Sequence, residues 1–226
     1  MIDYRKLRPG NLRSPEFNHL LLLLYWPIYG IGFFLVETLR PVADCTPMWV
    51  PMDDLIPFNE WFMAPYLFWF VFLVGMIGYL LLFDAKAFRR FMYFIMFTYT
   101  ITIVVYILYP TCQNLRPDGF TRDNIMTRII TRFYAFDTNT NVCPSIHVIG
   151  SMAVAFGAWD TPRFQKRIWK LAFLAMALLI SFSTVFVKQH SIVDVFWAFV
   201  VCLAGYLSVY AVPTEVRQPQ RKMQSV

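Results

Sequence analysis

Residues 171–194 read LAFLAMALLISFSTVFVKQHSIVD, and this stretch decides the fold class. The run from Leu171 to Val187 carries no charge, and its length matches the roughly 17 to 25 apolar residues that cross a bilayer. The run ends directly in Lys188-Gln189-His190-Ser191-Ile192-Val193-Asp194, where ionisable groups meet the apolar segment. Because such groups are expensive within a membrane, their presence there points to a function.

The whole chain has the composition of an integral membrane protein. Of its 226 residues, 58% are hydrophobic and only 15% are charged, whereas soluble domains carry about 25% charged residues. The formal net charge of +6 is explained by residues in the loops between apolar runs rather than by a nucleic-acid-binding patch. We therefore expect a single membrane domain over residues 1–226, surrounded by membrane lipids and without a nucleic-acid partner.

Apolar runs recur along the chain and predict an all-α integral membrane fold. We predict a bundle of six transmembrane helices at about residues 20–36, 62–83, 91–109, 146–159, 168–187 and 192–212. The fourth and sixth runs each contain one ionisable residue near the start, His147 and Asp194. No small-x-small cleavage site closes the first run at Phe34-Leu35-Val36, so we expect the first helix to stay attached.

Lysine and arginine gather on alternate loops, and this asymmetry orients the bundle because these residues concentrate on the cytoplasmic side. Fourteen of the 20 lie on one side: Arg5, Lys6, Arg8, Arg13, Lys86, Arg89, Arg90, Arg163, Lys166, Arg167, Lys170, Arg217, Arg221 and Lys222. The other side has Arg40, Arg116, Arg122, Arg128, Arg132 and Lys188. We predict a multi-pass protein of a plasma or inner membrane with both termini in the cytoplasm. His147 and His190 then share the non-cytoplasmic face.

The loop between the third and fourth helices, residues 110–144, is long enough to carry a function. Within it, residues 121–135 place apolar side chains every three to four positions. We predict an interfacial amphipathic helix that either roofs the site or only packs on the end of the bundle. Arg122, Arg128 and Arg132 then contact lipid phosphates or solvate this helix, and the second role is favoured because surface charge is common.

Two short motifs carry the candidate chemistry. A proline starts the fourth helix, so Ser145 and the backbone N–H of Ile146 lie at a helix N-terminus, where a phosphate is favoured. His147 lies in the first turn of this helix and can contact the same ligand. His190 and Asp194 are four residues apart and share one helix face. The carboxylate can then fix the imidazole tautomer and leave the other ring nitrogen nucleophilic.

Each motif also has a purely structural explanation. Ser191-x-x-Asp194 is a capping box, which can account for Asp194 as the start of a helix. Function is favoured because both histidines start helices on one predicted face, with Arg116 and Lys188 nearby as cations. A transporter with a proton relay and a structural membrane protein are the alternatives of other classes. The apolar middles of the helices disfavour a relay.

The order of these residues resembles the type 2 phosphatidic acid phosphatase superfamily of membrane lipid phosphatases and phosphotransferases. Three motifs of that family match in order: Arg116-Pro117, Pro144-Ser145-x-His147, and Ser183 followed by His190-x-x-x-Asp194. The sequence departs from the family where the lysine of the first motif falls on Tyr109, a glycine on Ile146 and an arginine on Thr184. The Cys-Pro-Ser-x-His and Gln-His forms resemble the branch that includes inositol phosphorylceramide synthases.

The resemblance implies a metal-independent enzyme that works through a phosphohistidine and uses no cofactor. His190 would attack phosphorus, Asp194 would orient it, and His147 would protonate the leaving oxygen and then activate the acceptor. The implied phosphate ligands are Arg116, Ser145, Ile146 and Lys188, supported by Tyr109, Ser183 and Thr184. The implied reaction is hydrolysis of a lipid phosphomonoester or pyrophosphate at the non-cytoplasmic face. Transfer of a phospho-head group is the alternative, and the oligomeric state stays open.

The cysteines and the third histidine complete the expectations. Cys45, Cys112 and Cys143 fall on the predicted outer side, where oxidation is possible. A bridge from Cys112 to Cys143 would close the long loop, but free thiols are favoured because nothing in the spacing enforces pairing. His19, at the cytoplasmic edge of the first helix, is expected at the membrane interface and is expected to be dispensable.

Overall fold

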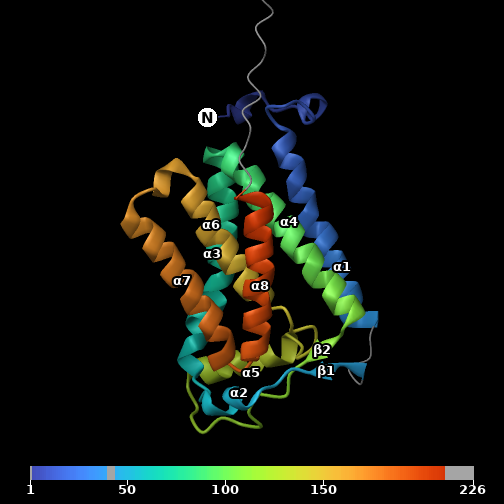
Figure 1. Cartoon of the computed structure of the whole chain (residues 1–226), viewed down its shortest axis with the longest axis vertical. Coiled ribbons are helices and arrows are strands. Elements are labelled where there is room, and N and C mark those ends of the chain that lie inside the picture. Colours follow the sequence, from blue (N-terminus) through green and yellow to red (C-terminus); the bar gives the residue numbers. More distant parts are fainter. Residues whose placement is uncertain (1, 40–43, 212–226) are drawn as a thin grey trace, which may run out of the picture.

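The computed structural model describes residues 2–39 and 44–211. The bundle consists of α1 (Tyr25–Leu39), α3 (Met63–Phe83), α4 (Ala85–Leu108), α6 (Ile146–Asp160), α7 (Arg167–Phe186) and α8 (Ile192–Val209), which lie side by side (Figure 1). Short 3-10 helices stand at Tyr4–Lys6, Pro9–Asn11, Asn18–Leu24, Glu60–Phe62 and Pro162–Phe164. Because the connections between helices alternate between the two ends of the bundle, α6 and α8 start at the same end.

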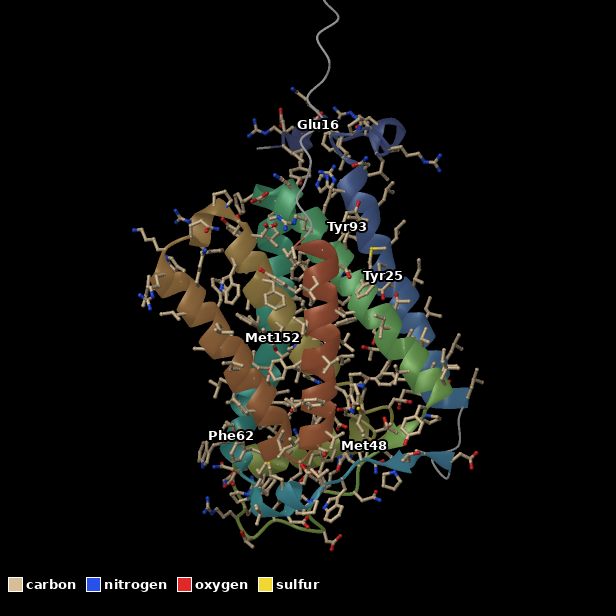
Figure 2. The ribbon with its side chains drawn as sticks, viewed as in Figure 1. Glu16, Tyr25, Met48, Phe62, Tyr93 and Met152 are labelled. Atoms are coloured by element: carbon tan, nitrogen blue, oxygen red, sulfur yellow. A yellow bond between two sulfur atoms is a disulfide. The ribbon has the colours of Figure 1, made fainter. Side chains whose placement is uncertain are left out.

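The remaining elements gather at the end of the bundle where α6 and α8 start. These are β1 (Thr46–Pro47), α2 (Pro51–Leu55), β2 (Thr111–Cys112) and α5 (Ile125–Phe136), and the N-terminal segment lies at the opposite end (Figure 1). Strand β1 pairs in parallel with β2. Met48 and Phe62 lie at the first end and Glu16 at the other, with Met152 inside the bundle (Figure 2). We call the first end the α5 end.

Five helical segments are long and apolar enough to cross a membrane: Asn18–Leu39, Glu60–Phe83, Ala85–Leu108, Arg167–Phe186 and Ile192–Val209. This confirms the prediction of an all-α, multi-pass membrane protein. The fourth predicted span, α6, has only 15 residues. At 1.5 Å per residue it is about 22 Å long, short of the roughly 30 Å of a hydrocarbon core. It therefore fails the length criterion that the other five meet.

Two helix starts differ from the prediction because capping side chains set them. Helix α4 begins at Ala85 rather than at residue 91, since the Asp84 carboxylate accepts from the Ala87 N–H at 3.0 Å. Helix α5 begins at Ile125 rather than at residue 121, since the Asn124 side chain accepts from the N–H groups of Met126 and Thr127. The end predicted at residue 212, Arg40, Arg217, Arg221 and Lys222 lie outside the described residues.

Helix α6 is the buried centre of the bundle. It packs against α3, α4, α7 and α8, and every residue from 147 to 158 is buried. Its glycine, serine and alanine residues allow neighbouring helices to approach closely, as is typical of helix contacts in membranes. Because its neighbours rather than lipid surround it, α6 does not need the length of a lipid-exposed span.

Gly150 on α6 marks a close approach between helices. A Cβ atom there would lie 2.8 Å from both Trp69 Nε1 and the Tyr99 hydroxyl. We expect Gly150→Ala to lower the free energy of unfolding by about 1 to 3 kcal/mol, the usual effect of overpacking. Gly75→Ala is the matched control, because its Cβ would meet nothing within 4 Å. Equal thermal unfolding of the two variants in detergent would contradict the expectation.

Candidate active site

The two predicted motifs meet at the α5 end of the bundle. Ser145 is the N-cap of α6 and Ser191 is the N-cap of α8. The Ser145 N–H donates to the backbone carbonyl of Asp194 at 3.3 Å, which joins the starts of the two helices. The rings of His147 and His190 lie edge to face, with 5.9 Å between centroids. The structure therefore brings the two histidines together at the helix starts.

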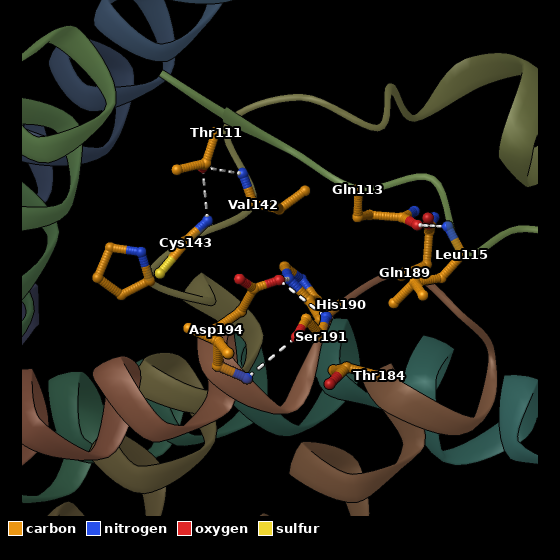
Figure 3. A network of polar contacts seen from close by, with 12 residues as sticks. Thr111, Gln113, Leu115, Val142, Cys143, Thr184, Gln189, His190, Ser191 and Asp194 are labelled. Atoms are coloured by element: carbon orange, nitrogen blue, oxygen red, sulfur yellow. Dashed lines mark hydrogen bonds and ion pairs between the residues drawn. The ribbon is translucent and has the colours of Figure 1, made fainter. Parts of the chain in front are cut away.

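The carboxylate of Asp194 is fully buried and bonds two groups at once. Its Oδ2 lies 3.2 Å from His190 Nδ1 and accepts the Ser191 N–H at 2.9 Å (Figure 3). Asp194 therefore makes both the capping-box contact and a contact with the imidazole. Because Nδ1 is the ring nitrogen facing the carboxylate, Nε2 is the one left for a ligand.

His147 lies in an aromatic layer that comes from α3. Its ring centroid is 4.4 Å from that of Tyr66 and 4.5 Å from that of Trp69, and the residue is only 7% exposed. Sequence reasoning missed these two contacts, because aromatic residues on an apolar span are indistinguishable from core residues. The two rings hold the imidazole of His147 in one orientation.

Several buried polar atoms around the histidines lack hydrogen-bond partners among residues 2–39 and 44–211. They are both ring nitrogens of His147, the Ser145 hydroxyl and Asp194 Oδ1. An unsatisfied buried polar group costs about 1–3 kcal/mol, so native structures rarely gather several of them without a reason. Their concentration at the starts of α6 and α8 is the arrangement expected where a polar ligand binds.

A cavity of about 40 Å³ is lined by both histidines. Its lining residues are Phe33, Tyr106, Asp137, Thr138, Thr140, Asn141, Val142, Ile146, His147, Gln189 and His190. Asp137 and Gln189 were not predicted as site residues, and their side chains bond each other, with Gln189 Nε2 donating to Asp137 Oδ2 at 3.1 Å. Burial raises the pKa of Asp137, although His190 and Arg116 oppose the shift.

Arg116 lies next to this cavity but does not line it. Its guanidinium donates to the side-chain oxygen of Gln189 at 2.6 and 3.0 Å and to the backbone carbonyls of Tyr134, Asp137 and Thr138. It also lies over the Tyr134 ring, 4.4 Å from the centroid. Burial lowers the pKa of Arg116, opposed by Asp137. Arg116 thus fixes the end of α5 and the amide of Gln189 beside His190.

The structure turns Lys188 away from the cavity. Its ammonium donates to the backbone carbonyl of Asp53 at 2.8 Å, and the residue is 8% exposed. Burial lowers the pKa of Lys188, opposed by the carboxylates of Asp53 and Asp54. Lys188 was predicted as a phosphate ligand because it stands next to the second motif in the sequence. In the structure the α2 segment passes close to it, and the Asp53 carbonyl is its partner instead.

The three residues predicted to support the site lie in different places. Tyr109 follows the end of α4 and is exposed. Ser183 and Thr184 are fully buried in α7, where their hydroxyls donate to backbone carbonyls of the same helix. The backbone carbonyl of Thr184 accepts the N–H groups of Gln189 and His190. Thr184 therefore supports the turn that carries His190 through its backbone rather than its side chain.

Two of the three arginines in or just before α5 form ion pairs close to the helix, and the third, Arg132, is exposed. Arg122 lies 3.2 Å from the buried carboxylate of Glu60, and Arg128 lies 2.8 Å from the exposed Asp123. Neither residue lines the cavity that both histidines line. Contact with lipid phosphates and solvation of the loop helix therefore both stay predictions for these arginines.

His19 is buried within the protein, and its expected place at the membrane interface stays a prediction. Its Nε2 lies 2.8 Å from the Tyr4 hydroxyl, and its ring meets Phe88 edge to face. The N-terminal segment covers it, and sequence periodicity gave no sign of that cover. The N-terminal segment lies at the end of the bundle opposite the two motifs (Figure 1).

The expectation of free thiols is wrong for Cys45 and Cys112, and the alternative bridge from Cys112 to Cys143 is absent. Cys45 and Cys112 form a disulfide, whereas Cys143 is buried and free. The bridge spans a sequence separation of 67 residues, and the parallel β1–β2 pair that aligns it has no recognisable signal in two-residue strands. The backbone N–H of Cys143 donates to the Thr111 hydroxyl at 3.0 Å (Figure 3). Burial raises the pKa of the Cys143 thiol.

We expect two of the four cysteines to react with a maleimide after denaturation without reductant, and all four after reduction. By the chain-entropy relation, a disulfide that closes a loop of this length stabilises the folded protein by about 4 kcal/mol, and loss of the bridge removes this contribution. Cys45→Ser should therefore lower the thermal midpoint, while Cys202→Ser, in the middle of α8, serves as a control without a disulfide. Four reactive thiols in the unreduced protein would refute the bridge.

The fold and the site define a multi-pass helical membrane protein with a buried histidine pair at one end of its bundle. Comparison with known families places this chain in one of them, since residues 90–218 match the PAP2 superfamily. The match covers more than half of the 226 residues, and the chain belongs to that superfamily, whose members are phosphatases or phosphotransferases. No curated protein and no solved structure matches the chain.

Proposed function

We propose that this protein is a membrane lipid phosphatase that hydrolyses a lipid phosphomonoester or pyrophosphate through a phosphohistidine on His190. The observation that carries the proposal is the pair of rings 5.9 Å apart, one of them bonded to a buried carboxylate and the other without a hydrogen-bond partner in the described chain. A phosphoryl group in the cavity that both rings line would give His190 a phosphorus atom to attack and His147 a hydrogen-bond partner. Membership of the PAP2 superfamily supports phosphatase or phosphotransferase chemistry.

In the first step, His190 Nε2 attacks phosphorus while the bond from phosphorus to the lipid oxygen breaks. His147 donates a proton to that leaving oxygen. The Ser145 hydroxyl and the Ile146 N–H, at the positive end of α6, stabilise the charge that develops on the phosphoryl oxygens. Asp194 holds the ring of His190 in place and stabilises its positive charge.

In the second step, His147 has become neutral and takes a proton from a water molecule. That water attacks phosphorus, the bond to His190 Nε2 breaks, and phosphate leaves. The residue that protonates the lipid oxygen is then the residue that activates the water, as microscopic reversibility requires. No step calls for a metal ion, and no cluster of ligands suited to a metal occurs in the described part of the chain.

The site is proposed to face the non-cytoplasmic side of a plasma or inner membrane. The Cys45–Cys112 disulfide lies at the α5 end with the histidines, and disulfides persist in oxidising compartments. The basic loops at the opposite end support cytoplasmic termini. In this orientation α6 is counted as a span together with the five longer helices, which makes six. Helix α5 then lies at the interface, exposing Ile125 and Phe136 while burying Ile130.

Phospho-head-group transfer, as in phosphorylceramide synthases, is the second candidate. It is favoured by the lining of the cavity, which includes a carboxyl group and no lysine or arginine among the described residues. A pyrophosphate carries more charge than such a lining neutralises, whereas a phosphodiester carries a single negative charge. The two candidates share His190 and His147 and differ in whether water or an alcohol accepts the phosphoryl group.

Purified protein incubated with phosphatidic acid, phosphatidylglycerol phosphate and a polyprenyl pyrophosphate tests the proposal. We expect release of inorganic phosphate from at least one of them. Parallel reactions with a phosphodiester lipid and an added lipid alcohol, followed by mass spectrometry, detect transfer. A transferred product without free phosphate would replace the phosphatase with the transferase. Neither product from folded protein would overturn the assignment.

A further inference from the structure

A buried carboxylate from α2 holds the start of α8. Asp53 Oδ1 accepts the Ile192 N–H at 2.9 Å, and Oδ2 accepts the Ser191 hydroxyl at 2.6 Å. Oδ2 also accepts the Val50 N–H at 2.9 Å within its own segment. Asp53 is fully buried, so solvent does not compete for these bonds. The first residues of α8 are therefore fixed by a residue far away in the sequence.

The same two segments meet at a second point. The Lys188 ammonium donates to the backbone carbonyl of Asp53 at 2.8 Å. Lys188 has a φ of 54°, in the left-handed region that residues with a side chain seldom adopt. The turn from Lys188 to Ile192 is thus attached to α2 at both ends, and His190 lies between the two attachments.

The bonds from Asp53 to the start of α8 determine which donors are left for the Asp194 carboxylate. The first N–H groups of a helix need acceptors other than the helix itself. Asp53 serves Ile192, and the Ser191 hydroxyl oxygen accepts the Val193 N–H at 3.1 Å. Asp194 is left with the Ser191 N–H and with His190 Nδ1. The carboxylate from α2 therefore leaves that of Asp194 directed at the imidazole.

The α2 segment is itself fastened. The Cys45–Cys112 disulfide and the β1–β2 pair connect its start to the chain that follows α4. From there to Asp53 is only a short distance along the chain, so α2 has little freedom to move relative to the bundle. Because α2 is restrained in this way, its bonds can hold the start of α8 in one place, whereas bonds from a free loop could not.

We infer that Asp53 is a positioning residue for phosphoryl transfer, holding the turn before α8 so that Asp194 orients the His190 ring. The inference rests on the proposed function of His190 as the nucleophile. Asp53 does not touch the cavity, and it acts through the two bonds to Ser191 and Ile192. Its loss should therefore slow the chemical step and leave the binding of substrate unchanged.

The test compares Asp53→Asn with Asp54→Asn. Asp54 is the exposed neighbour, and its carboxylate accepts from the Trp49 indole N–H. The probe is ³²P-labelled phosphatidic acid in mixed micelles, with kcat, KM and the rate of phosphoenzyme formation measured by rapid quench. For Asp53→Asn we expect kcat and phosphoenzyme formation to fall by roughly 10- to 100-fold, the scale of a small misplacement of a reacting group, with KM unchanged. Asp54→Asn should match the unaltered protein.

Ser191→Ala is the second variant, because it removes one bond to Asp53 and leaves the carboxylate paired with two N–H donors. A smaller fall in kcat at constant KM is expected. Unchanged kcat in both variants, with His190→Asn inactive, overturns the role of Asp53 and leaves the proposed function standing. A raised KM together with a lost unfolding transition means a role in folding alone and also overturns it. If the unaltered protein does not turn over the probe, or His190→Asn does, the proposed function and the inference fail together.

Discussion

His190→Asn is expected to abolish phosphoryl transfer, with a fall in kcat on the order of 10⁴-fold or more, as for the loss of other enzymatic nucleophiles. Asparagine is the sharpest replacement, because its amide nitrogen can take the place of Nδ1, which lies 3.2 Å from Asp194 Oδ2. The buried carboxylate keeps its partner, so stability is maintained. Nε2, the atom proposed to attack phosphorus, is absent.

The measurement is the incorporation of ³²P from phosphatidic acid into the protein, alongside release of phosphate. The control is His19→Ala, at the opposite end of the bundle, where the imidazole bonds Tyr4 and contacts no residue of the cavity lining. We expect full turnover from this variant once it is shown to be folded. Labelled protein from the His190→Asn variant would show that another residue is the nucleophile.

The bundle and the meeting of the two motifs were predictable because both follow from local pattern. An apolar run of sufficient length predicts a span wherever it occurs, and alternating spans bring every second helix start to the same end. His147 and His190 each start a helix, so their proximity needs no knowledge of the loops. The short α6 was predictable only as an apolar run. Its burial depends on small residues such as Gly150, whose neighbours come from other helices.

The contacts made by the loops could not be predicted, because no periodicity constrains their path. Cys45 meets Cys112, and Asp53 meets Ser191, across separations that only the folded chain defines. The partners of Arg116 and Lys188, the two cations beside the motifs, could not be predicted for the same reason. Their charge suggested phosphate, but carbonyl groups of neighbouring loops reach Arg116 and Lys188 first. The side-chain type indicates which chemical groups a residue can bind, but the path of the folded backbone determines which of these groups lie within reach.

His147→Asn is expected to separate the two half-reactions. With phosphatidic acid, the leaving alkoxide needs a proton, so loss of the acid should slow the first step by roughly 10²- to 10⁴-fold. With p-nitrophenyl phosphate, the leaving group departs as a stable anion and needs no proton. The first step should then proceed at nearly the rate of the unaltered protein, while the attack of water stays slow because its base is gone.

The variant should therefore release one equivalent of p-nitrophenol in a burst and then stop, with ³²P held on His190 as an acid-labile phosphohistidine. Rapid quench with labelled p-nitrophenyl phosphate measures both quantities, and the unaltered protein should show little trapped label. A variant without a burst, slowed equally with both substrates, would mean that His147 only supports the shape of the cavity. A burst from His147→Asn and none from His190→Asn would assign proton transfer to α6 and nucleophilic attack to α8. That division follows from the different surroundings of the two rings that line the cavity. One imidazole is bonded to a carboxylate, and the other packs on aromatic rings and has no hydrogen-bond partner among the described residues.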